Sequence, residues 1–263
     1  MQRQWKKFDA SKIKNHTGEK FSIGIVTYIA RYDRFFKQLI HQLTSIFPDV
    51  EIIVMINGHY DLAAQNEYLK KISGQLNQFQ NVKYTTHHNP EGLSKLWNKI
   101  ILNASTEHVF IFNDDISVSP KLREELFSMK KDTITLINNS WSHFMISKKI
   151  IHEIGWFDER FPAIGNEDQD YEFRLLAKQH IPNVVYNGEI KNLVEQPTTY
   201  SYGKNMKTVN GKYSADNWNF FTKKWEISAE EKPNYLYSTK FNLWFNPLPK
   251  LETPNFYPLT KHE

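Results

Sequence analysis

The feature that most constrains the fold is a regular alternation of short apolar runs with longer amphipathic segments. Residues 21–30 (FSIGIVTYIA), 50–56 (VEIIVMI) and 108–117 (HVFIFNDDIS) are rich in β-branched and aromatic residues and have the length of buried strands. Between them, apolar residues recur every three or four positions, which is the spacing of helices. Strands that alternate with helices predict a mostly parallel sheet with right-handed crossovers, so the predicted fold class is α/β.

The same patterns place the other expected elements. After Pro120 the periodicity loosens, and we expect residues 132–147 to form strands at the margin of the sheet. From Asn205 onward the periodicity is weak, and no element is predicted there. One further strand is expected at 81–88, and helices are expected at 31–47, 62–76, 91–105, 148–155 and 167–179.

Composition excludes several classes of protein. The 263 residues contain no cysteine, so disulfides, thiolate zinc sites and a cysteine nucleophile are excluded, and a reducing cytoplasm is the expected location. The net charge of +4 is too small to mark a nucleic-acid-binding protein, and no nucleic-acid partner is expected. No apolar run has the length of a signal peptide core or of a membrane span, which takes ~20 residues.

Carboxylates follow the most strand-like run of the chain. Asn113, Asp114 and Asp115 come directly after the buried run VFIF, at the carboxyl end of a predicted strand, where ligands of open α/β sheets bind. Adjacent carboxylates repel each other unless a cation or hydrogen-bond donors share their charge. A Mg²⁺ or Mn²⁺ ion that holds a nucleotide diphosphate needs only one or two of them. The alternative interpretation is a solvated turn.

A second acidic group opens a predicted helix. Residues 167–170 (EDQD) follow a loop, GWFDERF, that holds two more acids among aromatic residues. Acids in a first helical turn usually complement the helix dipole. A carboxylate at a loop-to-helix junction in a cleft is also a reasonable general base for an alcohol nucleophile.

The ordered set of segments FSIGIVTY, EIIVMING, NPEGLSKLWNKI, FIFNDDISVSP, GWFDERF and NEDQDYEFRL resembles a family 2-type inverting glycosyltransferase. The resemblance runs from Phe21 to about Lys178, and NWNFFTKKWE resembles the segment that often closes such domains. It implies a GT-A fold, which is a Rossmann-like, mostly parallel sheet flanked by helices. The expected organisation is a polar lead-in (1–20), a catalytic domain (21–200) and an aromatic-rich C-terminal extension (201–263).

The resemblance also implies a donor site. Asp115 matches the metal-coordinating acid of the DXD motif, and Asn113 stands where its first acid contacts the ribose. Asn57 stands where the family commonly has an Asp that reads uracil, so GDP and dTDP stay open beside UDP as the nucleotide. The full set of residues expected at the donor is Thr27, Tyr28, Arg31, Asn57, Gly92, Asn98, Asn113, Asp114, Trp141, Ser142 and His143.

Four of these residues have a second interpretation from the sequence. Tyr28 could simply pack at the edge, Asn98 could equally tie down a loop, Trp141 could fill the core, and His143 could be an ordinary hydrogen-bonded histidine. Neither His180 nor His262 is a convincing further metal ligand.

The resemblance assigns the chemistry to the second acidic group. Asp168 matches the base that deprotonates the acceptor hydroxyl for in-line attack on the anomeric carbon, while Mn²⁺ or Mg²⁺ stabilises the leaving diphosphate. Glu167 is the alternative base. Asp170 is expected to support its helix or Arg174 instead.

The expected function is transfer of a sugar from a nucleotide-sugar donor to a glycan or lipid-linked acceptor. A sugar nucleotidyltransferase is an alternative, although the first loop lacks the glycines that hold a triphosphate. A noncatalytic nucleotide- or carbohydrate-binding module is another. In the extension, Trp244, Phe245, Phe256 and Tyr257 lie among prolines and lysines; packing on the core is favoured over an acceptor lid, a partner contact or peripheral membrane binding.

Overall fold

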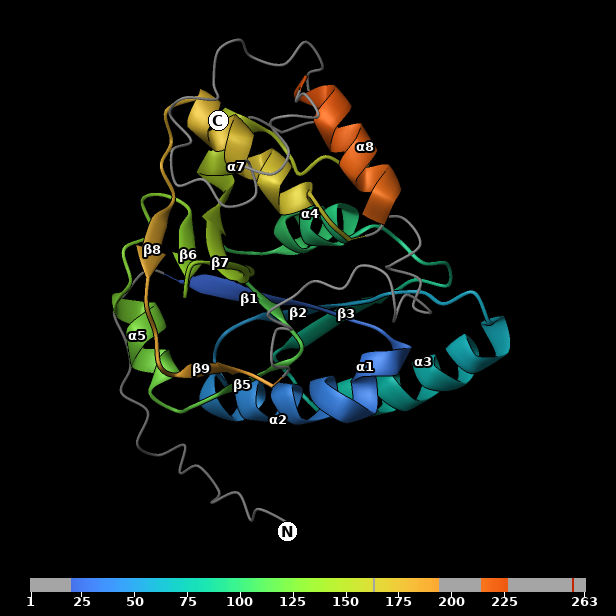
Figure 1. The fold of residues 1–263 in the computed structure, drawn as a ribbon. Helices are drawn as coiled ribbons and strands as arrows, with labels where there is room; N and C mark the ends of the chain where they lie inside the picture. Colours follow the sequence, from blue (N-terminus) through green and yellow to red (C-terminus); the bar gives the residue numbers. More distant parts are fainter. Residues whose placement is uncertain (1–19, 163, 194–213, 227–256, 258–263) are drawn as a thin grey trace.

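The structure is a computed structural model that describes residues 20–162, 164–193, 214–226 and 257. Its centre is a seven-stranded sheet of order β3-β2-β1-β4-β7-β6-β8, in which β7 alone runs antiparallel to its neighbours (Figure 1). The α/β prediction is therefore confirmed. The strands are β1 (Phe21–Thr27), β2 (Ile52–Ile56), β3 (Val82–Thr86), β4 (His108–Asn113), β6 (Thr135–Ile137), β7 (Ser140–Ser147) and β8 (Asn183–Val185), with β5 (Ile116–Val118) and β9 (Ile190–Asn192) forming a separate pair.

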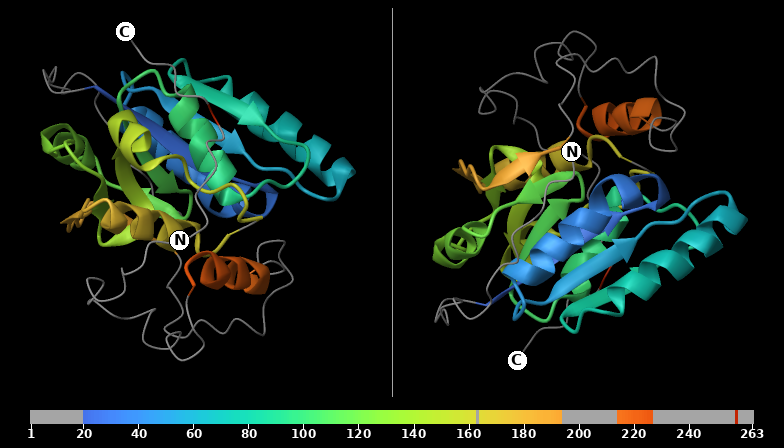
Figure 2. Two further views of the ribbon diagram at one scale, coloured as in Figure 1. Left: turned by 90° about the horizontal axis from the view of Figure 1, so that it is seen from above. Right: turned by 90° about the horizontal axis from the view of Figure 1, so that it is seen from below.

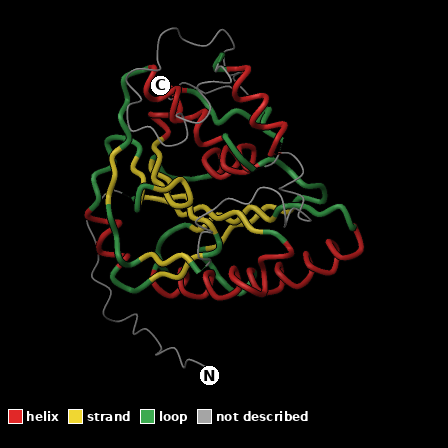
Figure 3. Tube along the Cα trace, viewed as in Figure 1, coloured by secondary structure: helices red, strands yellow, loops and turns green. Residues whose placement is uncertain are grey.

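Helices cover both faces of this sheet (Figures 1 and 3). The first face packs on α2 (Lys37–Ile46), α3 (Leu62–Leu76) and α5 (Leu122–Ser128). The second packs on α4 (Leu93–Asn103), α6 (Lys148–Ile154) and α7 (Glu167–Ala177). Strand β2 shows why the strands are continuously apolar, because Ile52, Val54 and Ile56 belong to the first core while Ile53 and Met55 belong to the second.

The connection from β1 to α2 differs from the single helix expected at 31–47. A three-residue helix, α1 (Ile29–Arg31), leads into a π-helix at Tyr32–Phe36, and α2 follows. Wide turns of this kind occur frequently at functional sites. Here the turn comes directly after the carboxyl end of β1.

Strand β7 corrects the expectation that residues 132–147 lie at the sheet margin, since it lies between β4 and β6. The chain reverses at Asn138 and Asn139, which have φ of 56° and 53°. Two consecutive residues with positive φ, often Asn, are the mark of a tight hairpin turn. The turn brings the fully buried half of β7 back into the sheet, where it is covered on both faces.

Helix α8 (Ser214–Lys224), which the sequence pattern did not predict, packs beside α7 (Figures 1 and 2). The Nζ of Lys224 lies 2.8 Å from Asp158 Oδ2 and 2.6 Å from Asp170 Oδ1, and all three side chains are at most 1% exposed. Arg160 and Arg174 pair with the same two carboxylates. A buried ion cluster therefore joins the two acidic segments GWFDERF and EDQD to α8.

No helix within the described ranges combines the length and the apolar character that crossing a bilayer requires.

We predict that Lys224→Met lowers the free energy of unfolding by ~3 kcal/mol, because it leaves two buried carboxylates without their shared cation. Urea denaturation followed by far-ultraviolet circular dichroism measures the effect. Lys223→Met is the matched control, since Lys223 is exposed on the same helix, and should change stability by less than about 0.5 kcal/mol. Equal unfolding midpoints for the two variants would contradict a stabilising role of the cluster.

Candidate functional site

The topology brings one end of four strands to a single edge of the sheet. Thr27 at the end of β1 is in register with Ile56 at the end of β2, and Val26 with Asn113 at the end of β4. Strand β7 runs the other way, so its early residue His143 pairs with Phe112. The residues expected at the donor from these strands therefore gather at the same edge.

Arg31 holds the two carboxylates that follow β4. Its Nε lies 2.5 Å from Asp114 Oδ1, and its Nη2 lies 2.8 Å from Asp115 Oδ1. The Asp114 side chain is 2% exposed, whereas those of Arg31 and Asp115 are 26% and 21% exposed. The positively charged guanidinium thus offsets the repulsion between the adjacent carboxylates.

Burial is the largest cause of the shifted pKa values of two groups in this cluster. It raises the pKa of Asp114 to about 6, although the nearby Arg31 guanidinium acts in the opposite direction. Burial also raises the pKa of Tyr28, which senses Arg31 and both carboxylates. The Oδ2 of Asp114 is buried and makes no hydrogen bond of normal geometry among the described residues, although the nearby Thr27 hydroxyl helps to lower the pKa of this carboxyl. A buried oxygen of this kind is available to a further donor or cation.

Two residues of β7 face different parts of the site. His143 is 1% exposed, and neither ring nitrogen has a hydrogen-bond partner in the described part of the chain. Burial lowers its pKa, and the charge of Asp115 opposes the shift, which places the imidazole in the field of that carboxylate. Trp141 points toward α7, where its Nε1 lies 3.4 Å from Glu172 Oε2. Strand β7 therefore connects the carboxylates after β4 with the acids of α7.

Glu167 and Asp168 at the start of α7 have different surroundings. Glu167 is 3% exposed and its Oε2 accepts a hydrogen bond of 2.5 Å from the backbone N–H of Gly165. Asp168 is partly exposed, and its Oδ1 accepts from the N–H of Gln169 at 2.9 Å. Burial and the charge of Asp168 raise the pKa of Glu167, and burial raises the pKa of Asp168. Asp168 is thus the more exposed carboxylate of this pair.

Asp170 has the supporting role expected from the sequence. Its Oδ2 accepts from Arg174 Nε at 3.1 Å, and its Oδ1 meets Lys224. Both oxygens of this fully buried carboxylate are engaged with cations of the protein.

Two asparagines expected at the nucleotide are instead engaged with loops. Asn98 is fully buried, and its amide binds the backbone of Phe157 at both ends and the carboxylate of Glu159. These contacts agree with the alternative interpretation of Asn98 as a loop tie, and its contact with the nucleotide stays a prediction. The amide of Asn57 similarly joins Gly58 to the backbone of Glu91.

Gly92 begins α4 where two backbone segments approach closely. A Cβ added to Gly92 would lie 2.5 Å from the backbone oxygen of Phe161. The loop at 161–162 therefore requires a glycine at this position, independently of any role of Gly92 in donor binding.

We predict that Gly92→Ala lowers the melting temperature, because backbone must shift to admit the methyl group. Gly74→Ala is the matched control: Gly74 lies inside α3 with nothing near the added atom, so alanine should raise stability by about 0.5–1 kcal/mol. Thermal melts followed by circular dichroism measure both. A Gly92→Ala variant as stable as the parent would rule out the steric requirement.

Two residues near the acids were not identified from the sequence. Glu172 lies one turn after Asp168, and burial together with the charge of Asp168 raises its pKa. The spacing of four residues in EDQDYE is the signal that could have indicated it. Asn217 of α8 donates from Nδ2 to the backbone oxygen of Gly165 at 3.0 Å and so holds the loop before α7.

One residue of the C-terminal tail is described. The backbone oxygen of Tyr257 accepts a hydrogen bond from Trp156 Nε1 at 3.0 Å, and the two rings meet edge to face. At this residue the tail packs on the core, which is the favoured interpretation. Trp244, Phe245, Phe256 and His262 lie outside the described residues.

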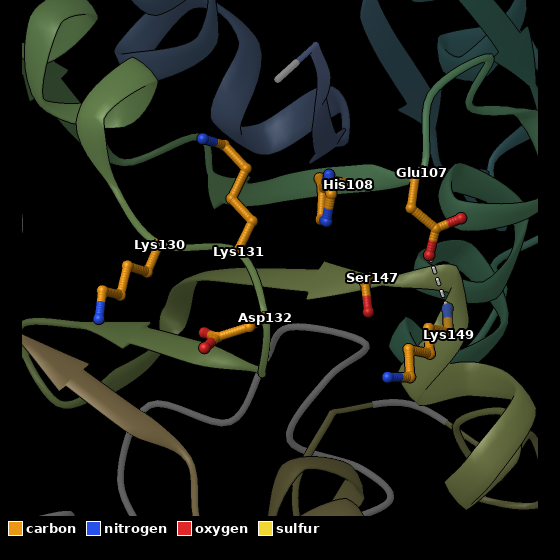
Figure 4. A pocket seen from close by; sticks show the side chains of 7 residues that line it. All are labelled: Glu107, His108, Lys130, Lys131, Asp132, Ser147 and Lys149. Carbon is orange, nitrogen blue, oxygen red and sulfur yellow. Dashed lines mark hydrogen bonds between the residues drawn. The ribbon is translucent and has the colours of Figure 1, made fainter. Parts of the chain in front are cut away.

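A cavity of about 340 Å³ lies at the opposite end of β4 (Figure 4). It contains none of the residues expected at the donor or the base, and its charges are mixed. Within the described ranges, no group of three or more His, Asp or Glu side chains forms a ready metal site. The lining residues of the cavity are Glu107, His108, Lys130, Lys131, Asp132, Ser147 and Lys149.

Comparison with known proteins identifies the architecture. Residues 95–224 match the family model described as "Glycosyltransferase like family 2". No curated protein sequence matches the chain significantly. The structure of GalNAc-T7 with UDP, GalNAc and Mn²⁺ is similar at a TM-score of 0.55 and 9% identity, covering 84% of this chain and 50% of that one.

Staphylococcus aureus TarS is similar at a TM-score of 0.51 and 14% identity, covering 82% of this chain and 47% of that one. A mannosyltransferase, PcManGT from Pyrobaculum calidifontis, in complex with GDP-Man and Mn²⁺, scores 0.45 at 11% identity, covering 67% and 60%. The chain thus spans about half the length of the first two structures. The resemblance stated from the motifs and the expected GT-A fold are confirmed.

Proposed function

The chain carries a glycosyltransferase family 2-like domain on a GT-A fold, and from this premise we propose that it transfers a sugar from a nucleotide-diphosphate sugar to a hydroxyl of a glycan or lipid-linked acceptor, with inversion. The observation that supports the proposal is the convergence of two unlike acidic groups at one sheet edge. The pair Asp114–Asp115 follows β4, and the pair Glu167–Asp168 opens α7, with the first residues of β7 between them.

The donor is proposed to bind over the ends of β1 and β4. Tyr28 and Arg31 offer a ring and a guanidinium beside the carboxylates, and Asn113 at the end of β4 is the proposed contact to the ribose. Trp141 presents a partly buried indole, whose face suits the apolar side of a pyranose. The nucleotide base is left open, since the amide of Asn57 is already engaged with the loop at Glu91.

Asp115 is the proposed holder of a divalent cation, Mn²⁺ or Mg²⁺. The residues fit such an ion, because Asp115 is partly exposed, Asp114 Oδ2 makes no hydrogen bond of normal geometry among the described residues, and diphosphate oxygens and water complete the shell of a hard cation. When bound, the ion would stabilise the negative charge of the departing nucleoside diphosphate. GalNAc-T7, which has a similar fold, was solved with UDP, GalNAc and Mn²⁺.

Asp168 is the proposed base. It is the more exposed member of the acid pair, and its raised pKa makes it a stronger proton acceptor than an ordinary aspartate. It would take the proton of the acceptor hydroxyl as the oxygen attacks the anomeric carbon opposite the leaving diphosphate. Glu167 is held by the Gly165 N–H in a buried position, where burial favours its protonated form.

The test is nucleotide release from a panel of UDP-, GDP- and dTDP-sugars with and without Mn²⁺. We expect metal-dependent turnover of one nucleotide class, which should fall by about 10²–10⁴-fold in Asp168→Asn and should be lost in Asp115→Ala. Glu167→Gln is the matched control for the base, because glutamine keeps the acceptor for Gly165. It should retain most of the activity.

Absence of turnover together with absence of a donor-induced thermal shift would instead favour a noncatalytic binding module. Loss of activity in Glu167→Gln with retention in Asp168→Asn would exchange the roles of the two acids.

We also predict an acid limb in the pH profile of kcat/KM for donor turnover. The base must be deprotonated, so the rate falls as the pH drops through its pKa. Because burial raises the pKa of Asp168 above the usual value of about 4, the fall should begin above pH 4. A profile that stays flat down to pH 4, measured with the fold checked by circular dichroism, would contradict Asp168 as the base.

A further inference from the structure

Arg31 binds both carboxylates that follow β4, including Asp115, which is the proposed holder of the metal ion. Its guanidinium binds one oxygen of Asp114 through Nε and one oxygen of Asp115 through Nη2. The planar fork of an arginine suits such double contact, which a lysine ammonium provides only as a point charge. The carboxylate pair therefore has a cation of the protein itself as its partner.

Charge makes the guanidinium and a divalent ion poor neighbours here. Asp114 is almost completely buried, and the buried imidazole of His143 beside Asp115 adds no negative charge. With Arg31 in place, a divalent ion would leave the cluster with an excess of positive charge in a partly desolvated site, which is costly. A nucleoside diphosphate would supply the anionic groups that offset this excess.

Arg31 also has room to change partners. Its side chain is 26% exposed, and it belongs to the short helix α1, directly before the π-helix at Tyr32–Phe36. Tyr28, one of the residues proposed at the donor, lies close enough to interact with it. Partial exposure of the side chain and the shortness of α1 are compatible with a change of partner by the guanidinium.

We propose that Arg31 is the resident counter-ion of Asp114 and Asp115, that it competes with a divalent cation for these carboxylates, and that a nucleoside diphosphate releases it by offering phosphate oxygens in their place. The inference rests on the proposed function, because the metal and the diphosphate are those of the donor. Its consequence is that metal and nucleotide bind with positive coupling, and that Arg31 is the source of the coupling.

The experiment measures Mn²⁺ binding directly, by electron paramagnetic resonance of free Mn²⁺, on the full chain with and without UDP, GDP or dTDP. For the parent protein we expect weak Mn²⁺ binding alone and binding about tenfold or more tighter with the matching nucleotide. For Arg31→Gln we expect Mn²⁺ binding without nucleotide to be at least about tenfold tighter than in the parent, and the effect of nucleotide to shrink.

Arg34→Gln is the matched control. Arg34 is exposed in the following π-helix and stacks on Phe35, so its removal changes the net charge equally without touching the carboxylates. It should leave both Mn²⁺ affinities as in the parent. Equal Mn²⁺ affinity of the parent and Arg31→Gln without nucleotide, or no coupling in the parent, would overturn the proposal.

Arg31→Lys keeps the test decisive if Arg31→Gln fails to fold. A lysine holds the pair less well than the arginine fork, so its Mn²⁺ affinity without nucleotide should exceed that of the parent, and equality would again overturn the proposal. The readout is separate from transfer. A protein that shows the coupling but turns over no nucleotide-sugar would retain the role of Arg31 and lose the proposed enzymatic function.

Discussion

The parallel pairing of β1 with β2 and β4 is the constraint on which the site depends. These strands are buried on both faces, so their middle positions are apolar and their polar residues lie near the strand ends. Parallel strands end at the same edge, and Thr27, Asn57 and Asn113 therefore share it. The antiparallel return of β7 then brings His143 to that edge from the other direction. The site is a consequence of strand direction before it is a consequence of any side-chain contact.

Helix α8 holds the segment that leads into α7. The buried Lys224 binds Asp158 before α7 and Asp170 within it, and Asn217 binds the backbone of Gly165 in the loop between them. These contacts fix the sharp entry to α7, where Gly165 and Asn166 both have positive φ. The position of Asp168 thus depends on residues some 50 positions downstream. The acidic motif at the start of α7 is therefore held by α8, a helix that is distant in the sequence.

The sequence predicted well what depends on local pattern. Strands β1, β2 and β4 and the bounds of α3 follow directly from apolar runs and helical spacing. The edge that carries the site follows from strand alternation, and the pairing of Asp170 with Arg174 follows from helix geometry. The fate of Asn98 could not be settled in this way, because a buried asparagine that ties a loop and one that binds a ligand have the same local pattern. The loop contact depends on the position of the backbone at Phe157, which lies 59 residues further along the chain.

The partner of the carboxylates after β4 shows the same limit in chemical terms. Adjacent acids need a cation or hydrogen-bond donors; the sequence motifs indicated a metal ion, whereas the structure places Arg31 of helix α1 beside them, more than 80 residues earlier in the chain. A metal ion and a guanidinium can each offset the repulsion between the two carboxylates. The second acid pair meets its own repulsion by burial of Glu167, which favours the protonated form, while Asp168 stays accessible. The two pairs of neighbouring acids thus lower their repulsion in different ways, since Arg31 pairs with both members of the first and burial favours the protonated form of one member of the second.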